Sequence, residues 1–382
     1  MKKMLLITLV FSLIFVPGII SAAEESSLHE KIIGDIDLSG LEEYTTRREF
    51  YELYGYTDPI TFLYDIITGN SNVADMSFWD AVSGIVTGEM RSLMSLVVNL
   101  FAVGMLGIFV KSMSTEFLSS PVKTSVDIVM AVTVAMMMST VFFDSSADCI
   151  SATSDIVAVL GVVCPAMILL MASGGLVTTA GAVSPVLMLA LGYGEFIINN
   201  ILIPLSVCMF VMNIMDAISD GINLKNIVGL MKKSSTVMLG ISFTVISGII
   251  NIEGITFSGA DNIGLKAVKY AAGSLIPVVG GFLSGSVDTV LSLLGVVKNG
   301  VGILGVLTVI SVMLIPLMRL LLIYAAMKLI SAVMSIFSSD TTSDLIDRGA
   351  SSLGFLITVN VSVMIMSMIL IVILMNMALR AV

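Results

Sequence analysis

Long apolar runs separated by short polar stretches fill most of the chain after residue 90. Most of these runs approach the roughly 20 residues that a helix needs to cross a bilayer. Open strands would leave backbone groups unpaired in lipid, so helices are the expected form. The pattern predicts an all-α, polytopic helical membrane protein with about 7–9 spans over residues 91–382. The clearest runs are residues 93–110, 126–143, 156–172, 176–192, 196–215, 237–252, 301–326 and 353–377.

The first 23 residues have the pattern of a secretory signal peptide. Two lysines precede an apolar run over residues 4–16, a Pro-Gly pair interrupts that run, and small residues follow at 21–23. This is the order of a basic region, a short apolar region and a cleavage site. The run is too short to favour a permanent span, and an uncleaved anchor is the alternative. In either case we expect residue 24 onward to begin outside the cytoplasm.

Residues 24–90 are polar enough to form a small segment outside the membrane, and five of the eight tyrosines lie between residues 44 and 64. Asp58 followed by Pro59 is typical of a helix start, and Gly69 is typical of a helix end. Four apolar positions between them share one face at helical spacing. A second amphipathic helix is expected at residues 78–86. We predict a small helical cap that lies on the outer membrane face.

Composition excludes most soluble functions. Hydrophobic residues make up 57% of the chain and charged residues 12%, whereas soluble domains carry about 25% charge. His29 is the single histidine, and the three cysteines lack CxxC spacing, so neither a disulfide framework nor a zinc site is expected. The 28 methionines are scattered and fit adaptable apolar packing. Without a Walker loop, GxSxG or HExxH motif, the chain is not expected to be an enzyme or to bind a cofactor.

The charge is unevenly distributed. Residues 24–80 hold thirteen acidic and three basic side chains, which accounts for the whole net charge of −10. An acidic solvated surface and a face for a basic partner are both open readings. The lysines at residues 111 and 123 and near 225–233 predict two cytoplasmic loops. Asp144, Asp148 and Asp155 have no basic neighbour in the sequence and predict an outside loop. Asp340, Asp344 and Asp347, against the single Arg348, also predict an outside loop.

An internal repeat is suggested by residues 201–219 and 313–331. Seven of nineteen positions are identical at a fixed offset of 112, and the same offset pairs Pro165 with Pro277. Chance similarity between apolar helices is the alternative. A true repeat would resemble the duplicated halves that are common in transport folds.

Residues 261–299 hold the strongest candidate site. Asp261 can cap a helix, a Pro/Gly break follows, and a second apolar piece ends near residue 298. Two short half-helices around such a break are typical of a re-entrant or discontinuous membrane segment. Charges at membrane depth are costly, so they would line a polar path or pair with one another, and snorkelling to the interface is the alternative. The candidate residues are Lys266, Lys269, Pro277, Gly280, Gly281, Asp288 and Lys298.

Two further groups of polar residues lie inside apolar runs. Arg319 and Lys328 are expected to face protein or water, for the same reason of cost. The second group is expected to form hydrogen bonds between helices. It comprises Glu195, Asn199, Asn200, Asn213, Asp216 and Asp220.

The chain resembles the stage III sporulation protein AE family of endospore-forming bacteria over essentially its full length. The most specific part is residues 264–299, where IPVVGG at 276–281 is followed by Ser284, Asp288 and Lys298. The resemblance implies a membrane component of the channel that joins mother cell and forespore, located in the mother-cell membrane around the forespore. It also implies partners: ring-forming membrane subunits, a secretion-type ATPase and a forespore-side channel protein. It supplies no catalytic residues.

Three functions remain open at this point. The first is a non-enzymatic subunit of the sporulation channel complex. The second is a stand-alone secondary transporter of a small solute, which the repeat and the broken helix favour. The third is a scaffold whose polar residues hold helices together.

Overall fold

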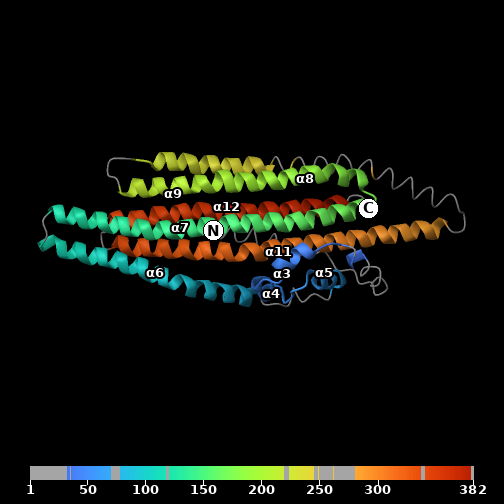
Figure 1. The fold of residues 1–382 in the computed structure, drawn as a ribbon, viewed down its shortest axis with the longest axis horizontal. Helices are drawn as coiled ribbons and strands as arrows, with labels where there is room; N and C mark the ends of the chain where they lie inside the picture. Colours follow the sequence, from blue (N-terminus) through green and yellow to red (C-terminus); the bar gives the residue numbers. More distant parts are fainter. Residues whose placement is uncertain are drawn as a thin grey trace.

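The computed structural model describes residues 32–34, 36–69, 78–117, 120–218, 223–244, 248, 261, 280–336 and 340–379, and these residues form helices joined by short turns (Figure 1). No strand occurs among them. The first helices are short: η1 (Ser39–Leu41), α3 (Glu42–Thr45), α4 (Arg48–Tyr54) and α5 (Pro59–Thr68). The long ones are α6 (Phe78–Phe117), α7 (Ser120–Ser173), α8 (Val177–Ile197), the π-helix η3 (Ile198–Leu202), α9 (Ile203–Ile218), α11 (Gly280–Ile336) and α12 (Asp340–Leu379). Residues 225–244 are also helical.

The expected helix after Asp58 is confirmed. Pro59 is its first residue, and the Asp58 carboxylate accepts hydrogen bonds from the backbone N–H groups of Ile60 and Thr61. Gly69 ends the helix in the left-handed region with φ of 73°, where a side chain would be strained. Local chemistry alone therefore defines α5.

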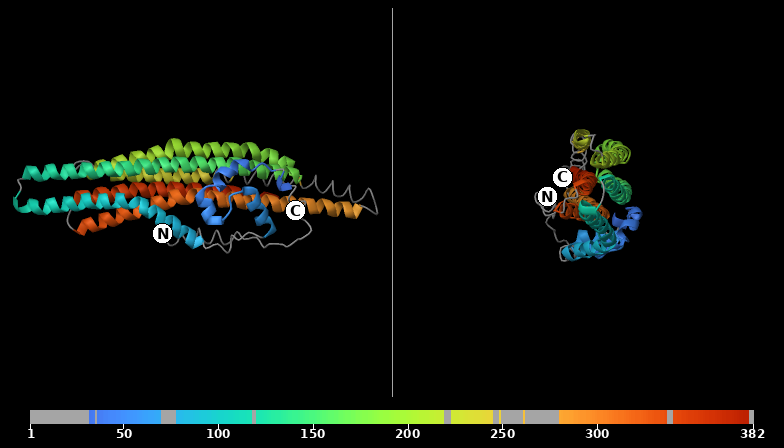
Figure 2. Two further views of the ribbon diagram at one scale, coloured as in Figure 1. Left: turned by 60° about the horizontal axis from the view of Figure 1, so that its bottom comes forward. Right: turned by 90° about the vertical axis from the view of Figure 1, so that its left-hand side faces the viewer.

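The N-terminal cap, defined here as residues 36–69, packs on the long helices through its aromatic residues. Phe50 and Phe62 are fully buried, with ring centroids 5.5 Å apart in edge-on contact. The Tyr54 hydroxyl donates a hydrogen bond of 3.3 Å to the carbonyl of Leu307 on α11. The cap lies beside α11 rather than beyond the end of the bundle (Figures 1 and 2). Its expected position on the outer membrane face stays a prediction, because the position of the bilayer along the helices is not defined.

The long helices run through positions where loops were predicted. The expected spans at 126–143 and 156–172 form a single helix, α7, of 54 residues. The prediction of an outside loop at Asp144, Asp148 and Asp155 is therefore wrong, because all three lie on α7. Two of the three are matched by arginines from other elements, so these carboxylates do not need a loop in water. Similarly, α8, η3 and α9 merge the expected spans at 176–192 and 196–215.

Four helical stretches of the described chain are long and apolar enough to cross a membrane: Ile128–Ser173, Val177–Ile218, Val290–Ile336 and Thr342–Met377. A fifth arises if Ser83–Arg91 and Leu93–Leu106, which meet at a bend of 47°, count as one span. The expected 7–9 spans are not confirmed. At 1.5 Å per residue, α7 is about 81 Å long, whereas a bilayer with its headgroups is about 40–45 Å thick.

Helices α7, α11 and α12 form the centre of the bundle. On α7 and α11, Val163 lies opposite Gly305 and Asp148 lies opposite Arg319, so the two helices are antiparallel. Helices α8 and α9 lie on one side of this centre, and α6 and the cap lie on the other (Figure 2). Close approach depends on glycine, because a Cβ at Gly305 would lie 2.7 Å from a methyl group of Val163.

Three smaller predictions also need correction. The basic loop expected at 216–235 is shorter, because α9 extends to Ile218 and a helix begins at Lys225. The residues around Asp344, expected outside in a loop, belong to the first turns of α12. The internal repeat is not confirmed: Pro204 follows a π-helix, whereas its counterpart Pro316 lies inside α11.

The hydrogen bonds at Asp58 give the cap a measurable pH dependence. Partial burial opposes ionisation, but the hydrogen bonds from Thr61 and Ile60 outweigh it, so the pKa of Asp58 is lowered. A lowered pKa means that the carboxylate stabilises α5 above the ordinary pKa of aspartate, and that this stability is lost as pH falls through the lowered value. We expect Asp58→Ala to destabilise α5 by about 1 kcal/mol at neutral pH, measured by hydrogen exchange of the α5 amides.

Asp58→Asn is the matched control. It keeps an acceptor for the two N–H groups and removes the titration, so the protection of its α5 amides relative to the unfolded chain should not change below about pH 4, where that of the parent should fall. If Asp58→Asn and the parent lose α5 protection together as pH falls, another group is responsible.

A charged cavity between the cap and two long helices

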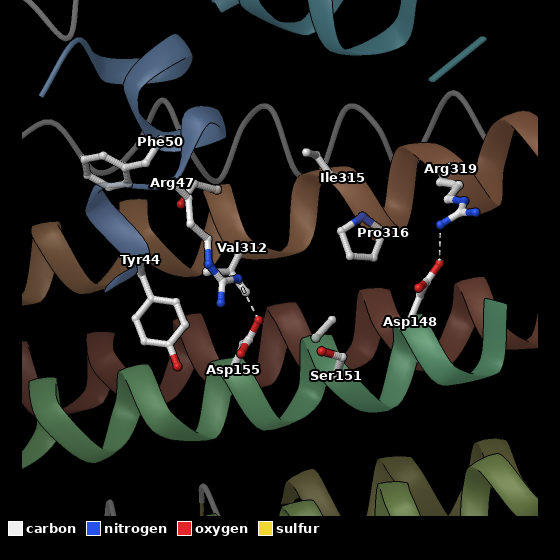
Figure 3. Close-up of a pocket in the computed structure, with 12 residues that line it drawn as sticks. Tyr44, Arg47, Phe50, Asp148, Ser151, Asp155, Val312, Ile315, Pro316 and Arg319 are labelled. Carbon is white, nitrogen blue, oxygen red and sulfur yellow. Dashed lines mark hydrogen bonds and ion pairs between the residues drawn. The ribbon is translucent and has the colours of Figure 1, made fainter. Parts of the chain in front are cut away.

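A cavity of about 240 Å³ lies where the cap meets α7 and α11 (Figure 3). The cap contributes Tyr44, Arg47 and Phe50, the last on α4. Helix α7 contributes residues spaced by one turn along a single face, and α11 contributes the turns around Pro316. The helical lining is Asp148, Ser151, Ala152 and Asp155 on α7, and Ser311, Val312, Ile315, Pro316 and Arg319 on α11.

Two ion pairs stand at the two ends of the cavity. Arg47 of the cap donates to the Asp155 carboxylate at 2.7 Å, and Arg319 of α11 donates to the Asp148 carboxylate at 2.8 Å. The side chains are between 24% and 40% exposed, so the pairs are partly in contact with solvent. Figure 3 shows Ser151 and Pro316 between the two pairs. The cavity therefore carries two positive and two negative groups and no net charge.

Pro316 changes the backbone chemistry of the cavity wall. A proline inside a helix has no N–H to donate to the carbonyl four residues earlier. On α11 that carbonyl belongs to Val312, which lines the cavity. The Val312 carbonyl therefore lacks its normal helical partner, and α11 has a local irregularity beside the cavity.

The cap side of the cavity is electrostatically coupled to α7. The hydrogen bond to Asp155 raises the pKa of Arg47, which therefore keeps its charge. Burial, followed by the nearby negative charge of Asp155, raises the pKa of Tyr44, so this phenol stays neutral. The guanidinium of Arg47 also lies 4.7 Å from the centre of the Tyr44 ring, within the range of a cation–π contact.

Among the candidate residues at 266–298, Lys298 has a described side chain, and it does not line this cavity. Lys266, Lys269 and Pro277 lie outside the described residues, so the predicted break is not tested. Gly280 and Gly281 are the first residues of α11, and Asp288 lies farther along it. Lys298 is described in full, and it is not the end of a half-helix as predicted, because α11 continues for 38 residues to Ile336.

Lys298 is 1% exposed and links α11 to α12. Its ammonium donates to the carbonyls of Leu374 and Met375, at 2.8 and 2.6 Å. Both acceptors are near the C-terminal end of α12, where the helix dipole favours a cation. Neither a polar path nor snorkelling describes this contact: the side chain joins two helices.

Asp261 also has a role that the sequence did not indicate. Its carboxylate accepts hydrogen bonds from the backbone N–H groups of Thr178 and Thr179, at 3.1 and 2.8 Å, and from the Thr179 hydroxyl at 2.7 Å. These groups belong to the first turn of α8, so Asp261 caps that helix across 82 residues of sequence. The hydrogen bonds outweigh the effect of burial, and the pKa of Asp261 is lowered.

The expected hydrogen bonding between helices is confirmed for part of the second polar group. Asn213 on α9 donates to Ser352 on α12 at 2.8 Å. Asp216 is paired with Arg348, and it also accepts a hydrogen bond of 2.5 Å from the backbone N–H of Leu224. Lys328 pairs with Asp347 at 2.6 Å, so it faces protein as expected, although its partner is not one of the charges that were expected to pair with one another. Asp220 lies outside the described residues.

The sequence did not identify the cavity, although it drew attention to some of its residues. Arg319 was noted as a charge in an apolar run, and Asp148 and Asp155 were noted as acidic residues without a basic neighbour. The sequence does not show which arginine pairs with which aspartate. Asp148 and Arg319 are 171 residues apart, and Arg47 and Asp155 are 108 residues apart. Complementary charges in otherwise apolar segments are the one pattern that could have suggested these pairs.

The cavity has no set of ligands suited to a metal ion. No group of three or more His, Cys, Asp or Glu side chains with metal-binding geometry occurs among the described residues. Cys149 and Cys164 are buried, Cys208 is exposed, and all three are free thiols.

Comparison with known proteins gives a consistent result. The family described as stage III sporulation protein AE matches residues 57–378. Stage III sporulation protein AE of Bacillus subtilis (strain 168) is 28% identical to this chain over 170 residues, which are 44% of this chain and 43% of that protein. The aligned part therefore spans less than half of the relative. No solved structure matches the chain.

Proposed function

The chain belongs to the stage III sporulation protein AE family, and on that premise we propose that it is a non-enzymatic integral membrane subunit of the channel complex that links mother cell and forespore. The observation that carries the proposal is the extent of the family match, which includes α5 of the cap and all four candidate spans. Membership itself supports a role at stage III of sporulation.

The proposed location is the mother-cell membrane that surrounds the forespore, where the protein would be needed for forespore development. The proposed partners are ring-forming membrane subunits, a secretion-type ATPase and a forespore-side channel protein. Two features of the cap are compatible with an assembly role. Its inner aromatic face is already buried against the long helices, and its outer face still exposes Tyr51 (55%) and Ile60 (42%).

A second candidate function is a stand-alone secondary transporter of a small solute. The cavity between the cap, α7 and α11 favours it, since a carrier needs a place for its solute within the helical body. Uptake into liposomes that contain the purified protein alone would separate this function from that of a channel subunit, which requires its partners.

The exposed face of the cap gives a direct test of the complex. We expect Tyr51→Ser combined with Ile60→Ser to reduce recovery of the partner membrane proteins when the tagged full-length protein is purified from sporulating cells. A central interface tyrosine contributes about 2 kcal/mol, which corresponds to about 30-fold weaker binding. The protein should still insert and accumulate, because neither side chain is buried in the cap.

Tyr193→Ser is the matched control. Tyr193 is similarly exposed, at 47%, but it lies on α8 on the other side of the bundle from the cap, so its replacement should leave partner recovery unchanged. Full recovery with the double cap variant would argue against the cap as the contact surface. Equal losses in both variants would point to a general effect on the protein.

A further inference from the structure

We infer that the cavity between the cap, α7 and α11 binds a small zwitterion, a solute of about dipeptide length that carries an ammonium group at one end and a carboxylate group at the other. The inference rests on the proposed function for its biological meaning, since a conduit or a carrier needs a place that recognises its cargo. It rests on the cavity itself for its chemistry: two Arg–Asp pairs, an apolar and aromatic wall, and about 240 Å³ of space.

The charge balance selects this class of solute. Arg47 and Arg319 offer two cations, and Asp148 and Asp155 offer two anions. A ligand with a single charge would compete for one member of a pair and leave the other member unmatched in a partly desolvated space, which is costly. An apolar ligand would desolvate all four groups without replacing any contact. A zwitterion can engage an arginine and an aspartate together and leaves no charge unmatched.

The distance between the pairs limits the length of the solute. Asp148 and Asp155 are seven residues apart on one face of α7, which corresponds to about 10.5 Å along the helix axis. A solute with its charges at the two ends of a short chain can approach both pairs, whereas an α-amino acid can reach only one. The volume is below the roughly 300–1,000 Å³ of pockets for drug-sized molecules, which also favours a small solute.

The remaining wall can bind the other parts of such a solute. One nitrogen of Arg319 donates to Asp148, and the planar guanidinium has further N–H groups that can bind a carboxylate. The Asp155 carboxylate accepts from Arg47 through one oxygen, and a carboxylate has further acceptor capacity for an ammonium. The Ile315 and Pro316 side chains lie between the two ion pairs, where they can contact a methylene chain (Figure 3).

Binding can be tested with three compounds that differ only in charge. The probes are 6-aminohexanoate, which has both charges, and hexanoate and hexylamine, which each have one. The full-length protein is purified into lipid nanodiscs, and titration calorimetry and thermal unfolding are measured with each compound. We expect 6-aminohexanoate to bind and to raise the unfolding temperature, and we expect at least tenfold weaker binding of the two singly charged compounds. Equal binding of all three, or no binding of 6-aminohexanoate to the folded protein, would overturn the inference.

Three variants locate the binding to the cavity. Arg319→Gln removes one cation, and Ser151→Leu fills the space while leaving both ion pairs intact, so both should abolish binding of 6-aminohexanoate. Arg48→Gln is the control, because Arg48 lies on the cap but its side chain is 84% exposed and does not line the cavity. If Arg319→Gln does not fold, Ser151→Leu decides. Undiminished binding to folded Ser151→Leu would refute the site.

The test of solute binding can fail or succeed independently of the test of the proposed function. Recovery of partners from sporulating cells tests the complex without reference to the cavity. Loss of solute binding with normal partner recovery in Ser151→Leu would support both conclusions. Absence of binding to the parent with normal partner recovery would remove the solute site and leave the subunit role.

Discussion

Replacing Gly305 with leucine is expected to destabilise the helical body strongly and to lower its unfolding temperature. A Cβ at this position would lie 2.7 and 3.0 Å from the two γ-methyl groups of Val163 on α7, and 3.3 Å from the Ile371 δ-carbon on α12. Val163 is fully buried and β-branched, so its methyl groups cannot rotate away freely. Overpacking at such a contact costs about 1–3 kcal/mol, and a leucine would separate two central helix pairs at once.

Gly295→Leu is the matched control. It lies on the same helix, and a Cβ there would meet nothing within 4 Å. Both substitutions remove a glycine from α11 and gain about 0.8 kcal/mol of helix propensity, so the difference between them isolates the steric contact. The measurements are the yield of monodisperse protein in detergent and its thermal unfolding. Equal yield and equal unfolding temperature in both variants would show that α7, α11 and α12 do not meet at Gly305.

The second large effect is expected for Arg348→Met. The Asp216 side chain is 3% exposed and the Arg348 side chain is 14% exposed, and the two form an ion pair between α9 and α12. Removal of the arginine leaves the buried carboxylate with the backbone N–H of Leu224 as its remaining bonded partner. An unmatched buried charge costs about 3–5 kcal/mol, so Arg348→Met should strongly lower the unfolding temperature.

A second substitution distinguishes the loss of the Arg348 charge from the loss of its packing. The double variant Asp216→Asn with Arg348→Met removes both charges and keeps an oxygen that can accept from Leu224, so most of the lost stability should return. Arg48→Met is a control for the loss of an exposed ion pair with Glu52, and its effect should be at most about 1 kcal/mol. If the double variant is as unstable as Arg348→Met alone, lost packing of the arginine stem is the cause.

The features that could be predicted from the sequence are those set by neighbouring residues. The Asp58-Pro59 start and the Gly69 end of α5 depend on hydrogen bonds and dihedral angles within a few positions, and the structure confirms both. The helical membrane class depends on apolar content, which is also local. The position of a turn inside a long apolar stretch could not be predicted from neighbouring residues. Asp144 and Asp148 indicated a loop, but α7 continues through both.

The cavity and the ion pairs could not be predicted because they depend on which helices become neighbours. An aspartate in an apolar run has the same local pattern whether it lies in a loop or opposite an arginine. The Asp148 carboxylate is stabilised on α7 by its ion pair with Arg319. This pair forms only because α7 and α11 pack in one particular antiparallel register. Lys298 is a similar case, since its two carbonyl acceptors lie 76 and 77 residues away.

The contact between Tyr54 and Leu307 has a consequence for biosynthesis. The two residues are 253 positions apart, so the ribosome completes the cap long before it makes the α11 surface on which the cap packs. At about 5–20 residues per second, this delay is roughly ten to fifty seconds. During that interval the aromatic face of the cap has no native surface to cover it. The nascent chain therefore needs either a chaperone for this face or early docking through the native contacts of the cap with α6 and α7, which leave the ribosome before α11.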